Sequence, residues 1–262
     1  SIGPPVPDNV GGPAPPGGSP VVTPPVVTPP VVTPPTPSGD VEILVVYTDA
    51  AEQANGGAAG IVSLAGLAVG NVSQALSNSG INASASLAGT AKWSHISSGD
   101  VISDLGVLAG PTSQGSAEAN TLRTQHNADL VAALVSGPGS GTTGYGSIPI
   151  GLGGNSAACW SVTRAAAVGA PGRSFAHEIG HNFGAGHDAA QGGPNAVASA
   201  RGFRFTGTDG TQYNTLLAYG SGTRIPYYSN PAVTYAGKPT GTASANNAAT
   251  IQTITAAASA YK

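Results

Sequence analysis

The sequence predicts an α/β fold, because short β-branched runs alternate with longer segments whose apolar residues recur at helical spacing. A second observation concerns the last part of the chain. Beyond about residue 190 it is rich in Gly, Pro and Tyr, and it shows no long periodic segment before a closing helix. We therefore expect a layered α/β part followed by a loop-rich part. Apolar residues make up 40% of the 262 residues, but many are Ala, so the predicted core consists of small side chains.

Residues 1–39 differ from the rest in composition. The stretch "VVTPPVVTPPVVTPP", residues 21–35, repeats one five-residue unit three times. Proline at this density removes amide donors and favours an extended left-handed helix. We expect a Pro-rich disordered linker at 1–39, followed by one domain at 40–262. A proline-rich ligand for a partner domain is the alternative.

The first two predicted elements are a buried strand and a core helix. Residues 41–48, "VEILVVYT", form a short β-branched run typical of a buried strand. Residues 58–78 predict a helix, and its polar Asn, Gln and Ser residues favour a core helix over a membrane span. The apolar face of this helix consists of Ile61, Leu64, Ala68, Val72 and Leu76.

Five further elements follow the same reasoning. Residues 81–93 alternate and predict a second strand. Residues 116–137 predict a helix that runs into "DLVAALV", which could itself be a strand. Residues 143–150 fit a short edge strand, and residues 160–168 fit another strand. The chain closes with a predicted helix at 245–262, whose apolar face includes Ile251, Ile254 and Ala258.

The segment "HEIGHNFGAGHD", residues 177–188, contains three of the five histidines of the chain. His177 and His181 are four residues apart, so on a helix both imidazoles lie on one face and can reach one ion. Glu178 is rotated by about 100° from His177. It can therefore stand beside the ion without ligating it, as a base acting on a metal-bound water does.

Gly184 and His187 complete this pattern. Gly184 can adopt the left-handed conformation that ends a helix, so the chain can turn back and bring His187 to the ion as a third nitrogen ligand. Three nitrogen ligands leave one position for water, which is typical of catalytic zinc. We expect one zinc ion. His95 and His126 are isolated, and we assign neither a role.

The composition limits the remaining possibilities. The formal charge of −3 shows no basic excess, which argues against a nucleic-acid partner. Cys159 is the single cysteine, so it is either a buried small residue or a site of intermolecular pairing. Asp and Glu are sparse and unclustered, so the sequence contains no pattern from which calcium sites could be predicted. Met is absent even at position 1, and we expect a mature form or a fragment with any signal peptide upstream.

The histidine segment resembles the long zinc signature of the metzincin metallopeptidases, and Asp188 after the third histidine is similar to the reprolysin-like branch. The stretches "VEILVVYTDAA", "LRTQHNADLVAALV" and "TLLAYGSGTRIPYYSNP" are also similar to that branch. The resemblance covers residues 40–262. It is nearest to bacterial enzymes of the peptidyl-Asp metalloendopeptidase type.

The resemblance implies a metzincin-like fold. In that fold a twisted, mostly parallel sheet and two long helices lie above an active-site cleft. An upper subdomain would cover about 40–185, and an irregular lower subdomain of about 186–262 would end in a helix. The resemblance also implies roles for five residues. These are the metal ligands His177, His181 and His187, the catalytic base Glu178, and Gly184 at the turn.

Asp188 would then be structural rather than a ligand. Leu217 stands where the family has the methionine that underlies the zinc site. Leu and Met have similar volumes, and such exchanges usually cost less than about 1.5 kcal/mol. We therefore expect the site to survive the exchange.

Two residues near Leu217 have open roles. Tyr219 is either a fifth ligand or oxyanion donor, as in other branches, or a packed tyrosine. A pocket for an acidic substrate residue would need a cation, for which Arg224 is a candidate and Arg201 and Arg204 are others.

Taken together, these features predict a secreted, extracellular, bacterial zinc metalloendopeptidase that acts as a monomer on protein or peptide substrates. The main alternative is a non-catalytic zinc-binding surface or adhesion module of the same fold. A structural protein with a fortuitous histidine cluster is a third interpretation.

Overall fold

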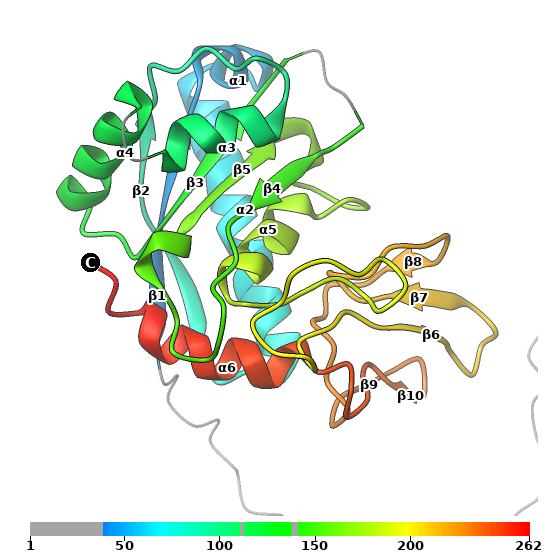
Figure 1. The fold of residues 1–262 in the computed structure, drawn as a ribbon. Helices are drawn as coiled ribbons and strands as arrows, with labels where there is room; N and C mark the ends of the chain where they lie inside the picture. Colours follow the sequence, from blue (N-terminus) through cyan, green and yellow to red (C-terminus); the bar gives the residue numbers. More distant parts are fainter. Residues whose placement is uncertain (1–38, 111–112, 138–140) are drawn as a thin grey trace, which may run out of the picture. The chain divides into compact units, whose positions relative to one another are not determined.

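A computed structural model describes residues 39–110, 113–137 and 141–262. The predicted linker therefore lies outside the described residues, apart from Gly39. The described part is a mixed α/β structure around a five-stranded sheet in the order β2-β1-β3-β5-β4 (Figure 1). The prediction of an α/β fold with a mostly parallel sheet is confirmed. Its strands are β1 (Asp40–Tyr47), β2 (Ser84–Lys92), β3 (Leu130–Val135), β4 (Gly144–Gly146) and β5 (Trp160–Arg164).

Parallel pairing joins β2, β1, β3 and β5, whereas β4 pairs antiparallel with β5 at one edge. β1 lies inside the sheet, and its residues from Ile43 to Tyr47 are all buried. A strand buried on both faces needs a continuous apolar run, which explains the β-branched sequence of this segment.

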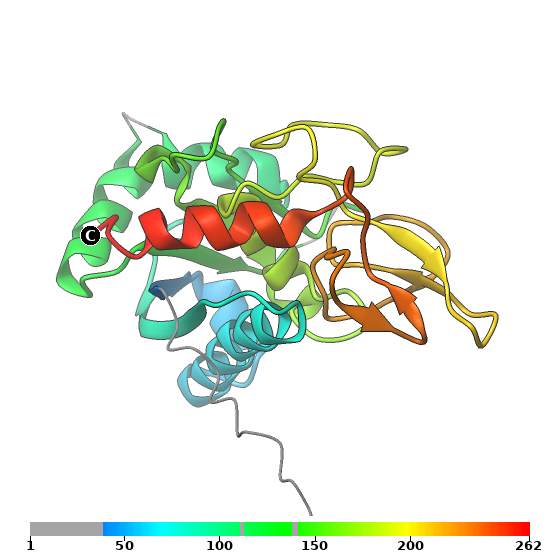
Figure 2. The same cartoon turned by 90° about the horizontal axis from the view of Figure 1, so that it is seen from below.

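Helices cover both faces of the sheet. α2 (Ala58–Asn78) lies on the opposite face from α3 (Val101–Ala109) and α4 (Gln114–Gln125), as Figures 1 and 2 show. By length and composition α2 is a candidate membrane span, with 39% of its most apolar window buried. It packs on the sheet as a core helix does. Its buried residues are Ile61, Ala65, Ala68, Val69, Val72, Ala75 and Leu76.

Two predicted boundaries need correction. The helix expected at 116–137 ends with α4 at Gln125, and a left-handed residue, Asn127, turns the chain into β3. The alternative interpretation of "DLVAALV" as a strand is therefore right, because its six apolar residues need cover on both faces. The strand expected at 160–168 ends at Arg164, where a 3-10 turn, η2 (Ala165–Ala167), begins.

The sequence did not reveal several short elements. They are α1 (Asp49–Ala54), α3, η1 (Ser156–Ala158) and the strands β6 (Arg204–Thr206), β7 (Gln212–Asn214), β8 (Thr223–Arg224), β9 (Thr234–Tyr235) and β10 (Lys238–Pro239). All except α3 are too short for a periodic pattern, and α3 has its buried Val101, Leu105 and Leu108 at helical spacing. The closing helix is confirmed as α6 (Asn247–Ala258). The helix that carries the first two motif histidines, α5 (Ser174–Asn182), has only nine residues.

Asn182 anchors the end of α5 to the sheet. Its buried side-chain amide nitrogen lies within hydrogen-bond distance of the carbonyl oxygens of Ser147 at 2.9 Å, Ala158 at 3.1 Å and Trp160 at 2.9 Å, which share its two N–H groups. One side chain thus joins α5 to the segments at the ends of β4 and β5. Near the start of α5, the Tyr228 hydroxyl donates to the Ala176 carbonyl at 2.8 Å. The helix is therefore fixed near both ends.

Replacing Asn182 by Asp tests this anchor. The carboxylate would face three carbonyl oxygens with no proton to donate, so we expect the free energy of unfolding to fall by about 3 kcal/mol. Urea denaturation measures the change. Asn120→Asp on the exposed face of α4 is the matched control, with an expected change below about 0.5 kcal/mol. Equal effects of the two substitutions would contradict the anchoring role.

Candidate metal centre and active-site cleft

All nine residues of α5 are buried, so this helix runs through the interior of the domain. It ends at Asn182, and Gly184, with φ +81°, then reverses the chain while the Ala185 N–H donates back to the Gly180 carbonyl at 3.0 Å. A Cβ on Gly184 would lie only 2.5 Å from Ile254 Cδ1, so this position needs glycine for space as well as conformation. Beyond this turn the chain leads to His187.

The three motif histidines meet at their Nε2 atoms. His187 Nε2 lies 3.2 Å from His177 Nε2 and 3.0 Å from His181 Nε2. The Nδ1 atoms face carbonyl oxygens, that of Leu216 at 2.7 Å from His177 and that of Ala185 at 2.8 Å from His181. A carbonyl oxygen only accepts, so Nδ1 carries the proton in both rings, and both Nε2 lone pairs point to the meeting point.

This donor set fits a zinc ion. Burial lowers the pKa of His177 well below its ordinary value, lowers that of His181 to about 4, and lowers that of His187. These shifts favour the neutral rings, whose lone pairs repel one another unless a cation lies between them. Tetrahedral zinc with Zn–N distances of about 2.0–2.1 Å places its nitrogen ligands about 3.3 Å apart, close to the observed separations. All three ligand atoms lie within 4.8 Å of one another.

Glu178 lies beside this cluster and is almost fully buried. Burial raises the pKa of its carboxyl to about 8, while the nearby Arg224 guanidinium acts in the opposite direction. The side chain has room only because β4 presents Gly144, where a Cβ would lie 2.5 Å from Glu178 Oε1. Gly146 lies equally close to the backbone of α5, because a Cβ added there would be 2.7 Å from the Glu178 carbonyl oxygen. β4 can therefore lie directly on α5.

Leu217 packs against α5 from the other side of the helix. It is fully buried, and a Cβ on Gly180 would lie 2.9 Å from both Leu217 Cδ2 and Tyr228 Cε1. The preceding residue, Leu216, supplies the carbonyl that orients His177. The turn that contains Leu217 thus supports the helix and one histidine ring together.

Asp188 joins the segment after His187 to this turn. Its Oδ2 accepts the Tyr219 N–H at 2.9 Å, and its Oδ1 pairs with Arg204 Nη2 at 3.1 Å. Tyr219 then lies against the histidines, with its hydroxyl 3.4 Å from His177 Nε2 and its ring centroid 4.9 Å from that of His187. Asp188 therefore fixes the backbone that carries Tyr219.

The other candidate side chains each have contacts of their own. Arg224 stacks on the Tyr219 ring at 5.5 Å and donates to the carbonyls of Gly172 and Ala218. Arg201 donates to the Gly193 carbonyl at 3.4 Å. His95 pairs with Asp104, away from the metal ligands. Cys159 is buried, and burial raises the pKa of its thiol to about 11.

The histidines and Glu178 open into a cleft of about 320 Å³. Most residues of the cleft walls were not predicted from the sequence. One signal was present, because Gly144 and Gly146 lie on the same face of the predicted edge strand, and glycine in a strand often marks close packing of another element. The residues that line the cleft besides the histidines and Glu178 are Ile102, Thr142, Gly144, Tyr145, Gly146, Ile148, Gln191, Gly192, Gly193, Pro194 and Tyr219.

Comparison with known proteins agrees with this arrangement. The sequence model of metallo-peptidase family M12 matches residues 38–229, a range that contains the complete histidine segment. The chain belongs to this family. Among M12 relatives, the peptidyl-Asp metalloendopeptidases of Stenotrophomonas maltophilia strains K279a and R551-3 are 34% and 33% identical over 210 residues. This alignment covers 78% of the chain and 48% of each relative.

A third relative, the peptidyl-Asp metalloendopeptidase of Xanthomonas campestris pv. campestris, is 33% identical over 78% of the chain and 47% of its own length. The chain thus spans about half the length of the curated relatives it matches. A solved structure described as a chaperone-substrate complex has the same fold, with a TM-score of 0.68 at 17% identity. The structural match covers 86% of this chain and 36% of the chain in that structure.

The ligand geometry of this M12 chain predicts one zinc ion per chain. We expect His187→Ala to weaken zinc binding by about a hundredfold or more, because loss of a ligand exceeds the effect of losing a supporting contact. Competition with a chromophoric chelator measures the affinity. His126→Ala, remote from the cluster, is the control and should bind zinc as the unaltered protein does. Unchanged affinity of His187→Ala would exclude His187 as a ligand.

Proposed function

We propose that this chain is the catalytic part of a secreted, bacterial zinc-dependent endopeptidase that hydrolyses peptide bonds. The observation that carries the proposal is the meeting of three Nε2 atoms in a cleft that also contains the buried carboxyl of Glu178. His177, His181 and His187 would hold the ion. When bound, zinc supplies a Lewis acid and lowers the pKa of a coordinated water.

The residues of the chain supply the proton transfers and the orientation of the substrate. In this proposal the ionised carboxylate of Glu178 accepts a proton from the attacking water and delivers it to the leaving amine. The Tyr219 hydroxyl, which also faces the cleft, is placed to donate to the oxygen of the scissile carbonyl as negative charge develops there. Asp188 and Leu217 act by holding the backbone around these groups.

Other parts of the proposal rest on the sequence. The Pro-rich segment 1–39 would be a spacer, and the domain would divide into an upper subdomain at about 40–185 and a lower one at about 186–262, with the cleft between them. The enzyme would act outside the cell as a monomer, in the arrangement of a metzincin of the reprolysin-like branch. The match to family M12 supports the peptidase part of this proposal.

Cleavage next to aspartate is the substrate preference we propose, since the relatives carry that specificity in their names. Arg224 is the best placed cation. Its charge acts on Glu178 and on two of the histidines, and its hydrogen bonds to Gly172 and Ala218 engage two of its five N–H donors. Three of its N–H groups are therefore left for the substrate carboxylate that this proposal requires.

Glu178→Ala separates an enzyme from a non-catalytic zinc-binding module. We expect the variant to bind one zinc ion, because its ligands are intact, and to lose casein hydrolysis by at least about a hundredfold. Metal content by atomic emission and release of casein fragments are the two measurements. Zinc chelation followed by zinc addition to the unaltered protein is the positive control. Undiminished cleavage by Glu178→Ala would overturn the role of this residue.

Arg224→Gln tests the source of the aspartate preference. Loss of the cation should reduce kcat/KM for Asp-containing peptides by about tenfold or more relative to the matched Asn peptides. Cleavage-site profiling on a peptide library gives both values. Arg201→Gln is the competing variant. If it loses the preference while Arg224→Gln keeps it, Arg201 is the specificity cation instead.

A further inference from the structure

Two exposed apolar side chains lie on the rim of the cleft. Ile102 is the second residue of α3 and is 50% exposed, and Tyr145 is the central residue of β4 and is 46% exposed. Both line the same cleft as Glu178 and the histidines. Side chains of this size exposed next to a reactive centre are suited to contact a ligand.

The hydrogen bonding of β4 shows how an extended peptide would meet them. The Arg164 N–H donates to the Thr143 carbonyl, and the Ser147 N–H donates to the Trp160 carbonyl, so odd-numbered residues of this segment bond to β5. In an antiparallel pair the residues between them point their N–H and C=O groups outward. Gly144 and Gly146 therefore offer these groups at the outer edge of the sheet, where a peptide can add as a strand.

Side chains of the added strand would alternate between the two faces of the sheet. Gly144 and Gly146 share the face of α5, because a Cβ on either would meet α5. Tyr145 points to the opposite face, on which α3 lies. Every second substrate side chain would consequently project toward Tyr145 and Ile102, away from the zinc side.

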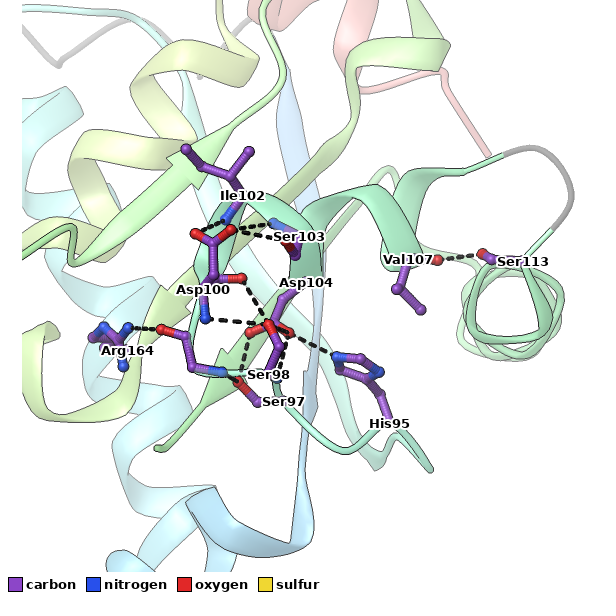
Figure 3. A network of polar contacts seen from close by, with 11 residues as sticks. His95, Ser97, Ser98, Asp100, Ile102, Ser103, Asp104, Val107, Ser113 and Arg164 are labelled. Atoms are coloured by element: carbon purple, nitrogen blue, oxygen red, sulfur yellow. Dashed lines mark hydrogen bonds and ion pairs between the residues drawn. The ribbon is translucent and has the colours of Figure 1, made fainter. Parts of the chain in front are cut away.

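A polar network fixes Ile102 in this place (Figure 3). The Asp100 carboxylate accepts the Ile102 N–H at 3.2 Å and caps the start of α3. One turn later, the fully buried Asp104 carboxylate accepts the Ser97 hydroxyl at 2.6 Å and pairs with His95 Nε2 at 2.8 Å. The loop before α3 is thereby wrapped onto the helix.

Arg164 joins this loop to β4. Its guanidinium donates to the carbonyls of Gly99, Gly137 at 3.1 Å and Thr142 at 2.9 Å. Gly99 precedes the cap of α3, and Thr142 leads into β4 and itself lines the cleft. One side chain therefore joins the start of α3 to the segment that leads into the edge strand, so the backbone that carries the rim is preorganised.

From these contacts we propose that Ile102 and Tyr145 form an apolar shelf that selects a large apolar side chain at one position of the substrate peptide. Ile102 is a specificity-determining residue in this proposal, and the Asp104 and Arg164 contacts position it. The proposal rests on the proposed peptidase function.

The test is a position-scanning peptide library in which Leu, Phe and Ser are compared at each position around the cleaved bond. We expect the unaltered protein to prefer Leu or Phe over Ser by about tenfold in kcat/KM at one position on the shelf side. Ile102→Ala should reduce that preference to about twofold and leave the two adjacent positions unchanged. Ile96→Ala is the matched control, because Ile96 is 89% exposed, lies close by in the chain and does not line the cleft.

A binding measurement keeps the two proposals distinguishable. The same peptides are titrated into zinc-loaded Glu178→Ala protein by fluorescence anisotropy, alone and combined with Ile102→Ala. If no peptide is cleaved but binding still prefers Leu through Ile102, the peptidase function fails and the shelf stands. If cleavage occurs and Ile102→Ala keeps the full preference, the shelf is wrong and the function stands. Absence of both cleavage and binding overturns the two together.

Discussion

Three neutral imidazoles that point their lone pairs at one place are the constraint on which the rest of the site depends. Such an arrangement is repulsive by itself, so the rings must be held by stronger contacts elsewhere. The carbonyls of Leu216 and Ala185 hold the Nδ1 sides of His177 and His181. α5 is in turn held by Asn182 and Tyr228. The support for the metal ligands therefore comes from two places, the start of β5 through Asn182 and the segments after α5 and β7 through Ala185, Leu216 and Tyr228.

Close approach of backbones is a second constraint, and it accounts for several of the glycines around the site. Only 8% of residues are charged and 39 are Gly. Gly144 and Gly146 let an edge strand lie on α5, Gly180 lets Leu217 pack beneath it, and Gly184 lets the chain turn against α6. Elements that touch through their backbones leave few positions for large side chains. Tyr145 and Ile102 are among the few large side chains that line the cleft.

These two constraints also explain which parts of the structure could be predicted from the sequence. The spacing of His177, His181 and His187 fixes a local geometry, so the cluster was predictable from a short segment, as were the buried β1 and the closing helix. The cleft walls were not predictable in the same way. Ile102 reaches the cleft only because β4 is at the sheet edge and Arg164 ties α3 to it. That proximity depends on strand order, which no local pattern encodes. The strands after residue 200 are two or three residues long, too short for any period.

The metal site also couples two parts of the described domain. His177 and His181 come from α5, which is packed against the sheet, whereas Leu216, Leu217 and Tyr219 come from the segment that follows β7. Asp188 connects the His187 segment to that second part through the Tyr219 N–H and Arg204. An ion bound by all three histidines would therefore hold both parts in place. At a free zinc concentration of one hundred times Kd, binding to the folded state alone contributes about 2.7 kcal/mol to stability. That is a substantial fraction of the roughly 5–15 kcal/mol that stabilises a typical domain. The histidine cluster would thus support the fold of the loop-rich part as well as the chemistry of the cleft.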